Sequence, residues 1–164
     1  MNWYNLFKLL HILAVVMMVG GMFARQLVRG IAKKSEHVKV IASLTQVAGR
    51  LDRAMVIPGS NLVLVFGIIL ALMLKWPIFG FLQGASQNWL LVSNILLILA
   101  MVLVGTVFIP YNKRLDSIIQ AALAEGRISP ELSAALDDQT NRLAHLMEEV
   151  GVLVIAALMV LKPF

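Results

Sequence analysis

An apolar stretch from Asn5 to Ala24, NLFKLLHILAVVMMVGGMFA, sets the strongest constraint on what this chain can fold into. About 20 residues at 1.5 Å each are enough to cross the hydrocarbon core of a bilayer as one α-helix. A single imidazole, that of His11, lies inside the stretch. A titratable ring in this setting is costly unless it is solvated, paired or ligated, so His11 is the first candidate functional residue.

The rest of the chain has the composition of a membrane protein. Hydrophobic residues make up 60% of it and charged residues only 14%, whereas ordinary soluble domains are about 25% charged. We therefore expect an all-α, polytopic membrane protein: a bundle of four transmembrane helices with amphipathic cytoplasmic helical extensions. The 164 residues leave no room for a separate soluble domain, and we predict one domain over 1–164 with spans at about 5–24, 55–76, 89–109 and 146–161.

The basic residues predict the orientation of these spans. Seven of the 14 Lys and Arg residues follow the first span and four follow the third, and positive charge normally stays in the cytoplasm. Both long loops are thus expected in the cytoplasm and both termini in the periplasm or outside, in a bacterial inner membrane. Because topology accounts for the net charge of +5, the expected partner is the lipid bilayer and not nucleic acid. The chain has no cysteine, which excludes disulfides, thiolate metal sites and a cysteine nucleophile.

The loops themselves contain helical patterns. Residues 37–55 carry apolar side chains at helical spacing, as in an amphipathic helix on the lipid surface. Pro58 is expected in the first turn of the second span, where a proline is tolerated, and Pro110 at the end of the third. Residues 115–141 read as two helices broken at EGRISP, with Gly126 ending one and Pro130 opening the next. The last helix is expected to begin well outside the membrane.

Polar residues inside the spans form two predicted layers. His11 and Asn94 lie at similar depth in the outer half, where the Asn94 amide could fix the imidazole tautomer. Glu148 and Glu149 lie in the inner half. Their carboxylates can form ion pairs with Arg25, Arg53 or Arg142 at the headgroup boundary, or they can take up protons from the cytoplasm.

Histidines on two helices of a bundle suggest a haem with two axial ligands. The predicted spans, however, separate His11 from His145 by about 20 Å along the membrane normal. A haem would therefore use His11 alone among the histidines. Its sixth position would be vacant, held by Met73 or Met159, or supplied by another subunit.

Four short motifs carry a resemblance to known families: KLLHILAVVMMVGG, LDRAMVIPGSNLVLVFGI, VFIPYNKRL and LMVLKPF. Together they resemble a domain-of-unknown-function family of four-helix bacterial integral membrane proteins, which is similar to CopD copper-resistance proteins and HemJ-type protoporphyrinogen oxidases. HemJ-like proteins bind haem b through a first-span histidine, so the resemblance implies that His11 is a haem ligand and that Arg53 belongs to the cofactor site. Residues 115–141 and VFIPYNKRL fit the uncharacterised family better than the HemJ type.

Two functions of different classes remain open. In the first, His11 ligates haem b, and electrons pass between a lipid-soluble or porphyrin donor and an unidentified redox partner. In the second, the chain is a non-enzymatic membrane component, for copper handling or as an accessory subunit, and His11 and Asn94 only tie helices together. Small residues in the spans allow a homo-oligomer in either case.

Overall fold

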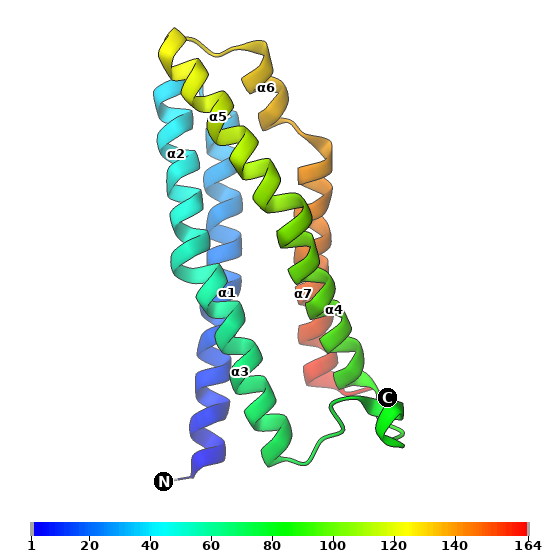
Figure 1. Cartoon of the computed structure of the whole chain (residues 1–164). Coiled ribbons are helices and arrows are strands. Elements are labelled where there is room, and N and C mark those ends of the chain that lie inside the picture. Colours follow the sequence, from blue (N-terminus) through cyan, green and yellow to red (C-terminus); the bar gives the residue numbers. More distant parts are fainter. Residues whose placement is uncertain (1, 164) are drawn as a thin grey trace. The chain divides into compact units, whose positions relative to one another are not determined.

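The computed structural model describes residues 2–163, and every regular element in that range is helical (Figure 1). The elements in chain order are α1 (Trp3–Lys33), α2 (Val38–Leu51), the π-helical turn η1 (Asp52–Val56), α3 (Ile57–Met73), the 3-10 turn η2 (Gly80–Gln83), α4 (Trp89–Leu103), the π-helical turn η3 (Val104–Phe108), α5 (Ile109–Glu125), α6 (Pro130–Leu136) and α7 (Gln139–Leu161).

Four helical stretches are long and apolar enough to cross a membrane. They are Trp3–Lys33, Val38–Met73, Trp89–Glu125 and Pro130–Leu161. Many large apolar side chains on them are exposed, as expected of surfaces that face lipid. The predicted all-α fold with four spans is confirmed. Each stretch is longer than the span that the sequence indicates, although the second ends at Met73, before the predicted end at residue 76.

The chain forms two compact units. One comprises the described parts of 1–76 together with 121–129, and the other the described parts of 77–120 together with 130–164. We call them the α1–α3 unit and the α4–α7 unit, and each is described by itself. The organisation of the whole chain as one domain stays a prediction.

In the α1–α3 unit, α1 runs beside the continuous stretch α2–η1–α3 (Figure 1). Glycines on both sides make the approach close. A Cβ atom built on Gly21 would lie 2.7 Å from Met55 Cβ, and one built on Gly59 would lie 2.9 Å from the Met18 backbone nitrogen. Small residues at such crossings let helices in lipid gain van der Waals contact.

The structure corrects the prediction for residues 37–55. The expected lipid-surface helix is instead α2, which continues through η1 into the second span, and its apolar residues Val38, Ile41 and Ala48 are buried. The reason is that α1 continues to Lys33 and packs against α2. A neighbouring helix of the same chain thus covers much of the stripe that was expected to face lipid.

Pro58 lies in the first turn of α3, as predicted, whereas Pro110 lies in the first turn of α5 and does not end a helix. The helix continues without a break before both prolines. Pro58 lies inside the helical stretch Val38–Met73, and Pro110 lies inside Trp89–Glu125. Each follows a π-helical turn by two residues, Pro58 after η1 and Pro110 after η3. Proline has no N–H, and its ring clashes with the carbonyl four residues earlier. The wider turn relieves that clash and lets the helix continue.

In the α4–α7 unit, α4 packs against α7, and Trp89 at the start of α4 is buried with the Lys162 ammonium 5.7 Å from its ring centroid. The predicted helix end at Gly126 is confirmed, and two further glycines in this unit lie in turns. Gly80, Gly84 and Gly126 have positive φ angles of 51°, 74° and 69°, which glycine adopts readily. α5 and α6 are separate helices, and α7 begins at Gln139, before the predicted span.

Candidate functional sites at His11 and at two buried pairs

The His11 side chain points from α1 onto α3 at Gly67. A Cβ atom on Gly67 would lie 3.3 Å from His11 Cε1 and 3.7 Å from Nδ1, so only a glycine leaves ordinary contact distance for the ring. A backbone hydrogen bond joins the imidazole to Val63, one turn earlier on α3. Nδ1 is nevertheless buried, with no hydrogen-bond partner among the described residues. A buried nitrogen without a partner is costly and is typical of a ligand-binding position.

The surroundings of His11 limit what it could bind. Within residues 2–163, no three His, Asp or Glu side chains come together in a way that could hold a metal ion. A metal bound by His11 would therefore need a carrier that supplies most of its ligands, as a porphyrin does. Met73 lies on the same helix as Gly67 and is 42% exposed. Ligation by Met73 or Met159 stays a prediction.

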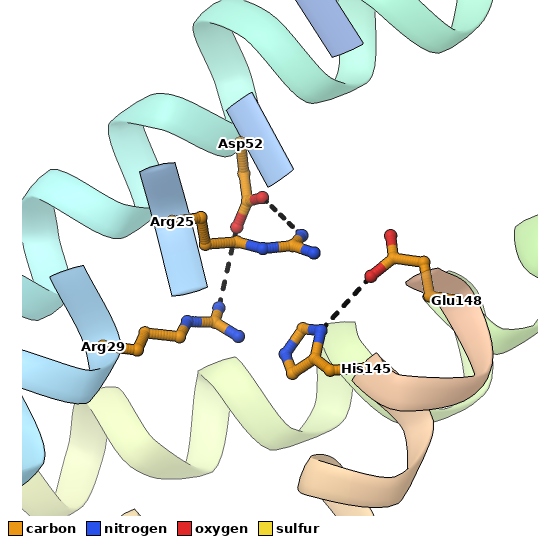
Figure 2. Close-up of polar contacts among 5 residues, drawn as sticks. All are labelled: Arg25, Arg29, Asp52, His145 and Glu148. Atoms are coloured by element: carbon orange, nitrogen blue, oxygen red, sulfur yellow. Dashed lines mark hydrogen bonds and ion pairs between the residues drawn. The ribbon is translucent and has the colours of Figure 1, made fainter. Parts of the chain in front are cut away.

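A second cluster, in the α1–α3 unit, joins α1 to η1 through charge (Figure 2). Arg25 Nη1 donates to Asp52 Oδ1 at 2.7 Å, and Arg29 Nη2 lies 3.6 Å from Asp52 Oδ2. The Arg25 side chain is 4% exposed and that of Asp52 is 18% exposed. Two cations share one carboxylate at the first residue of a π-helical turn, so the crossing of α1 and η1 is fixed by a largely buried ion pair.

Sequence reasoning selected Arg25 but missed its partner. Asp52 is the one acidic residue between Glu36 and Asp116, and a buried cation in an adjacent span requires an anion. The position of Asp52 as a lone acidic residue could therefore have identified it as the partner of Arg25. Arg53, the next residue, is exposed, and its part in cofactor binding stays a prediction.

The third cluster, in the α4–α7 unit, is a His–Glu pair on α7. His145 Nδ1 lies 3.2 Å from Glu148 Oε2, and their side chains are 4% and 8% exposed. The Phe108 ring stacks on the imidazole with centroids 4.2 Å apart and 15° between the planes. Phe108 is the last residue of η3. Figure 2 shows the ring and the carboxylate turned toward each other. A His–Glu pair can hold a proton between its members, or both members can be neutral.

The sequence analysis did not foresee this pairing, although the spacing of three residues on one helix allows it. Glu149 is half-buried on the same helix. Whether the two glutamates form ion pairs with arginines or take up protons stays a prediction.

Asn94 makes a contact within its own unit. Its Nδ2 atom donates to the Ile78 carbonyl at 3.3 Å, which ties α4 to the preceding loop. The neighbouring Ser93 is buried and donates to the Trp89 carbonyl. Since His11 and Asn94 belong to different units, a hydrogen bond between them stays a prediction.

A family model with the description "Predicted integral membrane protein (DUF2269)" matches residues 5–163, nearly the whole chain. No curated protein and no solved structure matches.

Proposed function

The chain belongs to the DUF2269 family of integral membrane proteins, and from this premise we propose that it binds haem b through His11 and serves a membrane redox or porphyrin-related reaction. The observation that carries the proposal is the His11 Nδ1 atom, buried and without a hydrogen-bond partner among residues 2–163. A nitrogen in that state gains most from a metal, because coordination replaces the water it has lost.

The residues around His11 suit an axial ligand. Gly67 leaves space for the ring where any Cβ atom would crowd it, and the backbone of Val63 restrains the ring orientation. Long apolar helices keep water away from the imidazole. Bound haem would supply one-electron redox chemistry, while the chain supplies the ligand, the orientation and the dry surroundings.

Other parts of the proposal rest on sequence alone. The electron donor would be lipid-soluble or a porphyrin, and the acceptor a redox partner. Eleven of the 14 basic residues follow the predicted first and third spans, which supports a bacterial inner membrane with both termini outside. Arg53 directly follows Asp52, the partner of Arg25, and Arg25 is about 21 Å from His11 along α1. Arg53 would therefore act at some distance from the iron.

One observation favours a different function. The backbone hydrogen bond to Val63 is what a purely structural histidine would use to tie α1 to α3. In that case the chain is a non-enzymatic component, such as a copper-handling protein or an accessory subunit, and the buried nitrogen only fixes the packing of two helices.

Absorption spectra of the purified protein separate the two functions. We expect a Soret band in the wild type and in the control variant His37→Ala, since His37 is exposed. We expect the band to disappear in His11→Ala, because the iron loses its axial nitrogen. A second control, His145→Ala, should keep the band.

Two results would overturn the proposal. One is a folded wild-type protein without a Soret band after expression with added haem precursor. The other is a band that His11→Ala retains at full intensity. Either result would leave the structural function of His11 as the better account.

A further inference from the structure

A small cavity in the α4–α7 unit is separate from the three clusters described above. Its volume is about 200 Å³, and α5 and α6 form its walls. Tyr111, Arg114 and Leu115 line one wall at helical spacing. The other wall comprises the α6 face Glu131, Ala134 and Ala135 and, beyond it, Asp138.

The two walls are tied together, yet their charges remain available. The Tyr111 hydroxyl donates to the Ala135 carbonyl at 2.8 Å, which links α5 to α6. Arg114 and Glu131 are exposed, and within residues 2–163 neither side chain makes an ion pair. Asp138 Oδ1 accepts from the Asn141 amide and caps α7, which fixes its carboxylate at the edge of the cavity. The cavity thus presents a cation and two anions that do not neutralise one another.

The cavity lies where the lipid-facing surface of this unit ends. Along the chain, exposed large apolar side chains stop at Ile109, two residues before Tyr111, and resume at Leu143, five residues after Asp138. Among the described residues between them, no large apolar side chain is exposed. The boundary between acyl chains and headgroups therefore falls beside the cavity, and tyrosine is a residue type enriched at that level.

The size of the cavity limits the ligand. A volume of about 200 Å³ is below the roughly 300–1,000 Å³ of sites for drug-sized ligands. A porphyrin does not fit, whereas a small polar group does. A group that carries both signs of charge complements Arg114 and Glu131 together.

We propose that this cavity binds the phosphoethanolamine group, and that its source is the headgroup of a zwitterionic membrane phospholipid. The phosphate lies against the Arg114 guanidinium, and the primary ammonium lies between the Glu131 and Asp138 carboxylates. The acyl chains follow the apolar surface that begins at Ile109 and Leu143. The proposal is independent of haem binding, because it concerns different residues and a different ligand.

Native mass spectrometry of the full chain in detergent tests the proposal. The probes are phosphatidylethanolamine, phosphatidylcholine, phosphatidylglycerol and free phosphoethanolamine. We expect one phosphatidylethanolamine to be retained with an affinity about tenfold above that of phosphatidylcholine, whose quaternary ammonium cannot donate hydrogen bonds. Arg114→Gln and Glu131→Gln should each weaken this binding about tenfold. Arg114→Lys should restore part of it, since the positive charge is kept.

Matched controls remove a neighbouring charge without touching the cavity. Lys113→Gln and Asp116→Asn alter exposed residues that do not line it, and both should bind phosphatidylethanolamine as the wild type does. If free phosphoethanolamine competes with similar affinity, the cavity recognises the same chemical group, but its ligand is the soluble compound and not the lipid.

Three results would overturn the proposal. The first is equal retention of all the phospholipids. The second is that phosphatidylglycerol binds most tightly and that Glu131→Gln raises its affinity further. Arg114 would then bind any anionic headgroup. The third is an equal loss of binding in the control variants.

Discussion

The two π-helical turns, η1 and η3, are followed by the same residue pair but make different side-chain contacts. Each is followed by an Ile-Pro pair, Ile57-Pro58 after η1 and Ile109-Pro110 after η3. η1 contributes Asp52 to an ion pair with Arg25, whose guanidinium stays charged at any physiological pH. η3 contributes Phe108, which covers the His145–Glu148 pair.

The comparison of η1 with η3 shows that a π-helical turn can position side chains of different chemistry. η1 begins with the charged Asp52, and three residues after the turn Gly59 lies against Met18. η3 ends with Phe108, whose ring stacks on His145, a titratable side chain. η1 thus provides the partner of a permanently charged side chain, Arg25, whereas η3 covers a titratable side chain, His145. Three substitutions separate these roles, from the largest expected loss of stability to the smallest.

Replacement of Asp52 by asparagine should have the largest effect. It removes the carboxylate that lies 2.7 Å from the guanidinium of Arg25, a side chain that is 4% exposed. We expect the free energy of unfolding to fall by about 3 kcal/mol, measured by denaturant titration in detergent micelles. Glu36→Gln removes an exposed acid of the same unit and should change stability by less than about 0.5 kcal/mol. A loss in Asp52→Asn no greater than in this control would mean that Arg25 does not need the carboxylate.

Replacement of Gly59 by alanine should have the next largest effect. The new Cβ atom would lie 2.9 Å from the Met18 backbone nitrogen, and backbone cannot move aside as a side chain can. We expect a loss of about 2 kcal/mol. The matched control is Gly105→Ala in η3, where nothing lies within 4 Å of the added atom, and it should be neutral or slightly stabilising. Equal melting temperatures for the two variants would show that the α1–α3 approach is looser than described.

Replacement of Glu148 by glutamine should have the smallest effect. The amide oxygen can still accept a hydrogen bond from His145 Nδ1, so the contact within α7 can persist without the carboxylate. We expect a loss of about 1 kcal/mol in the same titration. A loss as large as that of Asp52→Asn would mean that this pair is also ionised, and the contrast between the two turns would disappear.

The sequence predicted the parts of the fold that depend on hydrophobic length and on local turn chemistry. The four spans follow from apolar length, and the break after Glu125 follows from Gly126 and Pro130. The π-helical turns could not be predicted, because one extra residue in a helix leaves the apolar pattern nearly unchanged. The sequence therefore places Pro58 and Pro110 at the ends of spans, although the helical stretches continue past both residues.

The candidate sites were predicted only in part, for a related reason. A lone histidine in a span is visible in the sequence, but Gly67 beneath His11 depends on the pairing of two helices. The same holds for Asp52 with Arg25 and for Phe108 with His145. Residue types carry no information on which spans are neighbours, and these pairings need that information.

The unbroken course of α1 has a mechanical consequence. His11 and Arg25 lie on one hydrogen-bonded rod, 14 residues and about 21 Å apart. A rigid helix rotates about its axis as one body. The ion pair between Arg25 and Asp52 therefore also determines the direction in which the His11 imidazole points toward Gly67. Loss of the Arg25–Asp52 ion pair would let α1 rotate about its axis and would displace the His11 ring.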